Sequence, residues 1–200
     1  MIIDLENYAG RLGPFVSQSV DDALLLASEA SKVPAGGVIF EFAGQRGFSM
    51  AALSSGCAPG VIMWTSEKDL QCLQFLYEQE EMHDVNIIAG DLTQKQNLLP
   101  KQINLLHCDA YHDAGIARWY IDQLWSRVVP GGTICVHDMS EKLTYMQDER
   151  TVVLDALEQR GWEYHCPTEH LPLRKWNTES YTNNCQMVIR VPLDLTEETA

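Results

Sequence analysis

Short apolar runs alternate with longer segments of helical periodicity along most of this chain. Strands that alternate with helices form parallel sheets, because each helix carries the chain back to start the next parallel strand. Five runs are predicted strands: 38–42, 61–64, 85–89, 103–108 and 133–136. Predicted helices cover residues 20–31, 47–55, 70–77 and 117–128, and Pro130-Gly131-Gly132 is interpreted as the turn before the fifth strand. The pattern therefore predicts an α/β fold with a doubly wound, mostly parallel sheet.

The final third of the chain departs from this alternation. A predicted helix over 148–160 is followed by two apolar runs at 162–166 and 185–191. We expect these two runs to form an antiparallel pair that closes the sheet. Residues 167–184 lie between them, and a loop of this length in a compact domain usually lines a site.

The acidic composition argues against nucleic acid as a partner. The 200 residues carry 14 Lys and Arg against 28 Asp and Glu, a net charge of −14, which leaves no surplus of cations to neutralise phosphates. The longest apolar run near the N-terminus, residues 23–27, is far shorter than the roughly 20 residues that cross a bilayer and lacks the basic flank of a signal peptide. We therefore expect a cytoplasmic protein that binds neither nucleic acid nor membrane.

Six cysteines are spread along the chain without a Cys-x-x-Cys pair. Zinc ribbons and dithiol redox sites are recognised by such closely spaced pairs. Cys108 and Cys135 fall in predicted buried strands, where a free cysteine behaves as a small hydrophobic residue. The sequence thus predicts reduced core thiols and no structural zinc.

The loop after the first predicted strand decides the class of ligand, because open α/β sheets bind ligands beyond the carboxyl ends of their strands. A dinucleotide-binding loop has the pattern Gly-x-Gly-x-x-Gly. Gly44 and Gly47 could be its second and third glycines, but Phe42 stands in place of the first. A Walker phosphate loop needs Gly-Lys-Ser/Thr, and the chain has Gly47-Phe48-Ser49. Both nucleotide-binding patterns fail here.

The loop instead resembles motif I of the class I S-adenosylmethionine-dependent methyltransferases, acidic-x-Gly-x-x-x-Gly. Glu41 and Gly47 match this pattern, and Ala43 replaces its first glycine by the smallest side chain available. The resemblance implies a Rossmann-like, mostly parallel seven-stranded sheet with an antiparallel C-terminal strand. It also implies that Glu41 takes the ammonium group of the cofactor, and that Ala43, Gly44 and Gly47 form a turn beneath it.

The ends of the next three predicted strands extend the resemblance. Glu67 follows the second strand, where a carboxylate can accept hydrogen bonds from both hydroxyls of a ribose. Asp91 and Leu92 follow the third strand and are similar to the Gly-Asp element with which the family recognises adenine. Asp109 follows the fourth strand and completes the implied cofactor site.

Two strand ends carry unusually many histidines and aspartates: Asp109-Ala-Tyr-His112 after the fourth strand and His137-Asp138 after the fifth. They resemble a branch of the family that includes small-molecule and sugar O-methyltransferases, some with bound Mg²⁺. The resemblance implies that Asp109 and Asp138 ligate the metal, although Met139 stands where these relatives place a further Asp or Asn. We predict His112 as the general base, with His137 and Asp138 as alternatives.

We therefore interpret residues 1–200 as a single methyltransferase domain that transfers a methyl group from S-adenosylmethionine to a hydroxyl of a small-molecule acceptor. Residues 1–37 are its N-terminal helical segment, 38–138 its cofactor-binding core, and 139–200 its sheet closure and substrate loop. The acceptor pocket is expected to include four aromatic residues: Tyr111, Tyr145, Trp176 and Tyr181. A homo-oligomer stays open, as do a nicotinamide oxidoreductase and a non-catalytic cofactor-binding partner subunit.

Overall fold

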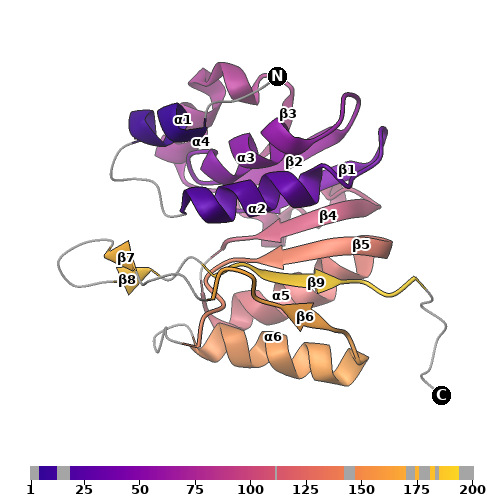
Figure 1. Ribbon diagram of the computed structural model, residues 1–200. Coiled ribbons are helices and arrows are strands. Elements are labelled where there is room, and N and C mark those ends of the chain that lie inside the picture. The colour runs from indigo at the N-terminus through magenta and orange to yellow at the C-terminus, as the bar shows by residue number, and fades with distance from the viewer. Residues whose placement is uncertain are drawn as a thin grey trace.

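The computed structural model describes residues 5–12, 19–110, 112–141, 147–169, 174–175, 181–182 and 185–193. Its centre is a seven-stranded sheet with the strand order β3-β2-β1-β4-β5-β9-β6 (Figure 1). Strands β1 to β5 are parallel to one another, and β9 runs antiparallel to both of its neighbours, β5 and β6. This confirms the predicted fold class, including the antiparallel strand near the C-terminus.

The strands are β1 Val38–Phe42, β2 Ile62–Glu67, β3 Val85–Ala89, β4 Ile103–Cys108, β5 Val128–Val136, β6 Tyr164–His165 and β9 Met187–Arg190. The α-helices are α1 Leu5–Leu12, α2 Val20–Ala30, α3 Phe48–Gly56, α4 Leu70–Glu78, α5 Ala114–Gln123 and α6 Gln147–Arg160. Two-residue strands β7 Arg174–Lys175 and β8 Tyr181–Thr182 pair outside the main sheet.

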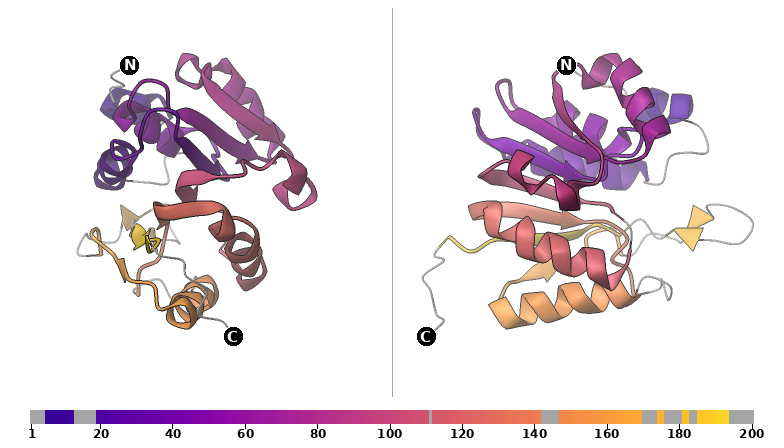
Figure 2. Two further views of the ribbon diagram at one scale, coloured as in Figure 1. Left: turned by 90° about the vertical axis from the view of Figure 1, so that its right-hand side faces the viewer. Right: turned by 180° about the vertical axis from the view of Figure 1, so that it is seen from behind.

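Both faces of the sheet are covered by helices. Successive residues of a strand point to opposite faces, so each strand contributes side chains to both cores. Ile39 and Leu105 belong to the core packed under α1, α2 and α3. Their neighbours Phe40 and Leu106 belong to the core packed under α5 and α6. Figure 2 shows these two helix layers on either side of the sheet. The central strands β1 and β4 therefore read as largely apolar runs.

Local signals fixed several elements where we predicted them. Helix α2 begins after Ser19, whose hydroxyl accepts from the backbone N–H of Asp22 at 3.1 Å and donates to its carboxylate at 2.7 Å. The first of these hydrogen bonds satisfies one of the free backbone donors of the first turn. Strands β3 and β4 have the predicted bounds. Within the described ranges, no helix has the length and apolar character that a membrane span requires.

Three features differ from the sequence interpretation. Pro130-Gly131-Gly132 is not a turn but a bulge inside β5, where Gly131 has φ +76° and its N–H donates to the carbonyl of Val191 at 3.0 Å. Helix α1 lies in the N-terminal segment that was predicted to be helical, but no bounds were predicted for it, and the segment 167–184 contains β7 and β8 rather than loop alone. The bulge forms where Val191, directly after β9, exchanges backbone hydrogen bonds with Gly131 and Gly132, in a segment whose composition is typical of turns.

Candidate active site

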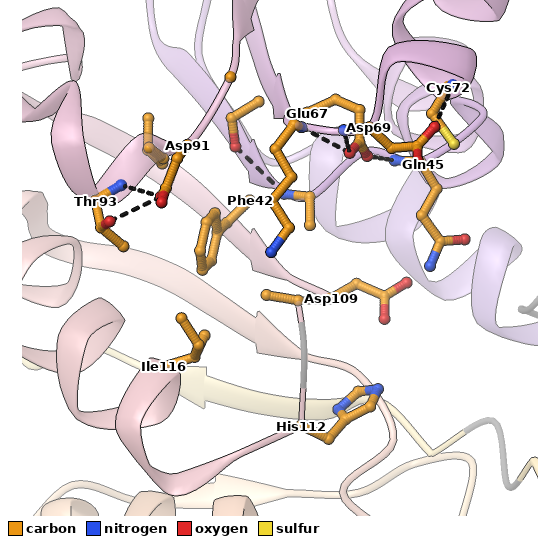
Figure 3. Close-up of a pocket in the computed structure, with 16 residues that line it drawn as sticks. Phe42, Gln45, Glu67, Asp69, Cys72, Asp91, Thr93, Asp109, His112 and Ile116 are labelled. Carbon is orange, nitrogen blue, oxygen red and sulfur yellow. Dashed lines mark hydrogen bonds between the residues drawn. The ribbon is translucent and has the colours of Figure 1, made fainter.

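A cavity of about 680 Å³ lies at the carboxyl ends of β1, β2, β3 and β4, where α/β sheets bind ligands. Figure 3 shows Glu67 and Asp69 on one side of it, Asp91 and Thr93 on the other, and Asp109 and His112 below. Its lining comprises Phe42, Ala43, Gln45, Ser66, Glu67, Lys68, Asp69, Cys72, Gly90, Asp91, Leu92, Thr93, Asp109, Ala110, His112 and Ile116. Ligand pockets of this size accommodate molecules as large as nucleosides.

The turn after β1 has an unusual backbone conformation. Ala43 has φ +70° and Gln45 φ +44°, a region that side chains with a Cβ rarely adopt. This explains why the related motif has glycine at the position of Ala43. At Gly44 the constraint is space, because a Cβ there would lie 2.2 Å from Oγ1 of Thr65. Glycine at position 44 is therefore required by the packing against Thr65 in the protein interior and not by the cavity.

Glu41 lies beneath this turn and is completely buried. Its carboxylate accepts hydrogen bonds from the hydroxyls of Ser49 and Thr65, the latter at 2.8 Å, and lies 3.2 Å from Nδ1 of His107. Neither Glu41 nor Gly47 lines the cavity. The expected contact of Glu41 with a ligand ammonium is therefore not supported by its position; the carboxylate connects β1, β2, β4 and α3 instead.

Glu67 lies on the cavity wall and also fastens the turn. One carboxylate oxygen accepts from the N–H of Gln45 at 2.7 Å, and the other accepts from Lys68 and Asp69 at 2.7 and 2.8 Å. The loop after β1 is thereby held against the end of β2. Glu67 thus lies on the cavity wall, and it also holds the loop after β1 in place. Its position in the sequence does not reveal this second role.

Asp91 caps the short 3₁₀ turn Leu92–Gln94 on the opposite wall. Its carboxylate accepts from the N–H and the hydroxyl of Thr93 at 3.0 and 2.7 Å. These two hydrogen bonds lower the pKa of Asp91, so the group is ionised and able to accept from a ligand. Leu92 is buried beside it and offers an apolar surface.

His112 lies at the bottom of the cavity in a geometry typical of an oriented base. Its Nδ1 is 2.6 Å from Oε2 of Glu149, and its Nε2 is 3.4 Å from Oδ2 of Asp138. Glu149 is itself positioned by the hydroxyl of Tyr120, which donates to its other oxygen at 2.9 Å. Burial opposes the charged imidazole, but the hydrogen bond that His112 donates to Glu149 and the nearby carboxylates raise the pKa of His112 above its ordinary value.

His137 lies behind the cavity, completely buried between two carboxylates. Its Nδ1 is 3.2 Å from Oδ1 of Asp109 and 3.4 Å from Oδ2 of Asp138. Despite its burial, these carboxylates raise the pKa of His137 well above its ordinary value. Burial likewise opposes ionisation of Asp109, yet the His137 imidazole holds the pKa of that carboxyl well below its usual range. The three groups form a buried ion-paired cluster.

This cluster does not fit the expected Mg²⁺ site. Magnesium binds oxygen ligands at about 2.0–2.1 Å in octahedral geometry, usually one or two carboxylates plus water. Here Asp109 and Asp138 both direct an oxygen at the same imidazole nitrogen, and a protonated imidazole cannot be a metal ligand. The imidazole of His137 lies between the two carboxylates to which the resemblance assigned a cation.

The predicted site residues fall into three groups. The cavity is lined by Ala43, Glu67, Asp91, Leu92, Asp109 and His112. Five others lie outside the lining, behind the residues that form it: Glu41, Gly44, Gly47, His137 and Asp138. The predicted acceptor aromatics Tyr111, Tyr145 and Trp176 lie outside the described residues, as does the side chain of Tyr181. Glu149 and Tyr120 were missed, since nothing in their helical context distinguishes them from ordinary helix residues.

The sheet order, the antiparallel strand next to β5 and a cavity over the ends of β1 to β4 are the architecture of class I S-adenosylmethionine-dependent methyltransferases. Residues 42–139 match the model of a family described as a methyltransferase domain. The chain therefore carries a methyltransferase domain of this class. No curated protein matches the sequence.

Several solved structures share the fold at low sequence identity. An O-methyltransferase of Streptomyces achromogenes, TomG, solved in complex with S-adenosylmethionine, has a TM-score of 0.70 at 16% identity, over 94% of this chain and 89% of that one. An O-methyltransferase of Bacillus cereus has 0.65 at 14%, over 92% and 86%. A precorrin-6y C5,15-methyltransferase of Geobacter metallireducens has 0.65 at 14%, over 85% and 87%. At these identities the similarity shows the fold alone.

Proposed function

We propose that this protein transfers the methyl group of S-adenosylmethionine to a hydroxyl oxygen of a small molecule. The observation that carries the proposal is the His112–Glu149 pair at the bottom of the cavity, with Nδ1 of His112 only 2.6 Å from the carboxylate. Glu149 holds Nδ1 of His112, and Nε2, which lies 3.4 Å from Oδ2 of Asp138, is the nitrogen proposed to accept the substrate proton. A hydroxyl is the acceptor that most needs such a base.

The cofactor is proposed to span the cavity from Asp91 to Asp109. Asp91 and Leu92 take the adenine, Glu67 the ribose hydroxyls, and the backbone of Ala43 the methionine portion. Asp109 offers a carboxylate to the ammonium group, a role that the buried Glu41 cannot fill. Glu41, Gly44 and Gly47 hold the turn from behind.

The chemistry asks little of the protein beyond orientation, because a sulfonium methyl group is already activated. The acceptor oxygen attacks the methyl carbon in line with the carbon–sulfur bond, and the bond's electron pair passes to sulfur, leaving S-adenosylhomocysteine. Positioning of the two reactants contributes most of the rate enhancement. His112 takes the hydroxyl proton on Nε2, and Glu149 stabilises the imidazolium that forms.

Release of S-adenosylhomocysteine tests this function. The full chain is incubated with S-adenosylmethionine and a panel of small phenols, catechols and sugars, and the product is quantified by chromatography. We expect turnover with at least one hydroxyl compound and none with its O-methyl ether. Calorimetric binding of NADH in preference to S-adenosylhomocysteine would overturn the assignment.

Glu67→Ala should weaken S-adenosylhomocysteine binding by about 1.5–3 kcal/mol, the range for hydrogen bonds to a charged group, or roughly 10- to 150-fold. The substitution removes the proposed ribose contact and releases the turn at Gln45. Calorimetry measures the affinity, with Glu158→Ala on the exposed side of α6 as the matched control. Equal affinities of the two variants would contradict the placement of the ribose.

The ion pairing of His137 with both aspartates leads us to propose that the reaction proceeds without Mg²⁺. Turnover should therefore survive exhaustive chelation with EDTA and should not rise when MgCl₂ is added back. The measurement is the initial rate before chelation, after it and after re-addition. A rate that falls on chelation and recovers with magnesium would restore the metal assignment implied by the resemblance.

A further inference from the structure

A second cluster of potential ligands lies away from the cavity, at the junction of β6 and β9. It comprises Cys166, Glu169 and Cys185, whose two sulfurs and one carboxylate oxygen all lie within 4.8 Å of one another. The two cysteines are 19 positions apart in sequence, so no spacing motif announces them. They meet because Cys166 directly follows β6 and Cys185 comes two residues before β9, its pairing partner.

Backbone hydrogen bonds hold the three side chains together. The N–H of Glu169 donates to the carbonyl of Cys166 at 3.2 Å, which closes a turn between these two residues. The N–H of Gln186 donates to the hydroxyl of Thr168 at 3.0 Å, which holds this turn against the start of β9. The cluster is thus preformed by the fold and does not depend on flexible surface side chains.

The loop after β5 supplies a further support. The N–H of Met139 donates to the carbonyl of Cys185 at 3.1 Å, and the hydroxyl of Ser140 donates to Oε1 of Glu169 at 2.8 Å. Ser140 is almost completely buried. A buried donor on a carboxylate ligand is the type of outer contact that fixes ligand orientation in metal sites.

The chemistry of the cluster suits a thiophilic cation. Thiolates are soft ligands that select zinc and similar metals, and zinc also accepts carboxylate oxygen.

We propose that Cys166, Cys185 and Glu169 bind one zinc ion in tetrahedral geometry, with water in the fourth position. The ion joins the end of β6 to the start of β9 and, through Ser140 and Met139, to the loop that follows Asp138. This site is distinct from the buried Asp109–His137–Asp138 cluster.

The test uses the full chain with its thiols reduced by a phosphine. Zinc is titrated against a chromophoric chelator, and Co²⁺ is added as a spectroscopic substitute. We expect one equivalent of zinc per chain and near-ultraviolet sulfur-to-cobalt charge-transfer absorption. Cys166→Ser and Cys185→Ser should each abolish that absorption or halve it, and Ser140→Ala should weaken zinc binding by about 10- to 100-fold.

Matched controls locate the ion. Cys57→Ser and Cys72→Ser change half-buried cysteines elsewhere and should leave the stoichiometry at one, as should Asp138→Asn. The proposal is overturned if the reduced protein takes up no zinc, or if Cys166→Ser retains full affinity while Asp138→Asn loses it. Formation of a Cys166–Cys185 disulfide in air, with no zinc uptake by the reduced chain, would equally overturn it.

Discussion

Replacing His112 by alanine is expected to lower kcat by about 10²- to 10⁴-fold, the usual contribution of a positioned general base. The affinity for S-adenosylhomocysteine should change little, because His112 is proposed to act on the acceptor. Steady-state turnover and calorimetry measure the two effects separately. His83→Ala, on the exposed 3₁₀ turn near β3, is the matched control. A His112→Ala variant with undiminished turnover would transfer the role of base to Asp138 or to the acceptor's own acidity.

The same assignment fixes the pH profile. His112 must be neutral to accept a proton, and its neighbours raise its pKa above the ordinary value. Turnover should therefore increase with pH through that raised pKa and fall toward acidic pH. Glu149→Gln removes the main favourable partner of the imidazolium, so the acidic limb should move to lower pH while kcat declines through lost orientation. An unmoved limb in this variant would exclude His112 as the titrating group.

Glu41→Ala is expected to destabilise the fold by about 3–5 kcal/mol, the cost of removing one partner from a buried charged network. The substitution leaves Ser49, Thr65 and His107 without their shared acceptor in the interior. Urea unfolding measures the loss, with Glu158→Ala as control. Glu41→Gln, which keeps an acceptor oxygen, should lose less and serves if the alanine variant does not fold.

Unfolding free energies, measured together with cofactor affinity, distinguish the structural role of Glu41 from the contact with the cofactor ammonium group that the motif implies. A Glu41→Gln variant of normal stability that had lost cofactor affinity would place the carboxylate at the ligand. A less stable variant that binds S-adenosylhomocysteine with nearly unchanged affinity would support the buried network.

The sequence predicted the central strands well because they are buried on both faces. Such strands read as apolar runs bounded by polar or turn residues, which is why β1 and β4 were placed to the residue. The bulge at Gly131 could not be predicted, because the same dipeptides favour a turn. Its conformation depends on Val191, 60 positions later, supplying the hydrogen bonds.

Only those residues of the candidate site that follow a strand could be predicted from the sequence. Glu67, Asp91, Asp109 and His112 follow strands, and the parallel sheet brings strand ends to one edge. Glu149 is positioned by the packing of α6 on α5, a contact between segments that no local pattern relates. The meeting of the two cysteines beside Glu169 depends in the same way on the pairing of β6 with β9.

Ala43, Gln45 and Asp138 are the non-glycine residues with positive φ in the described part of the chain, and all three lie at the candidate site. Each such conformation costs of order 1–3 kcal/mol, and the surrounding contacts must offset it. Selection for heat tolerance alone would therefore first favour substitutions at these positions. Such substitutions would relax the backbone that shapes the cavity. In this fold, gains in thermal tolerance and retention of the site geometry are expected to conflict, and screens for hardier variants need a parallel readout of ligand binding.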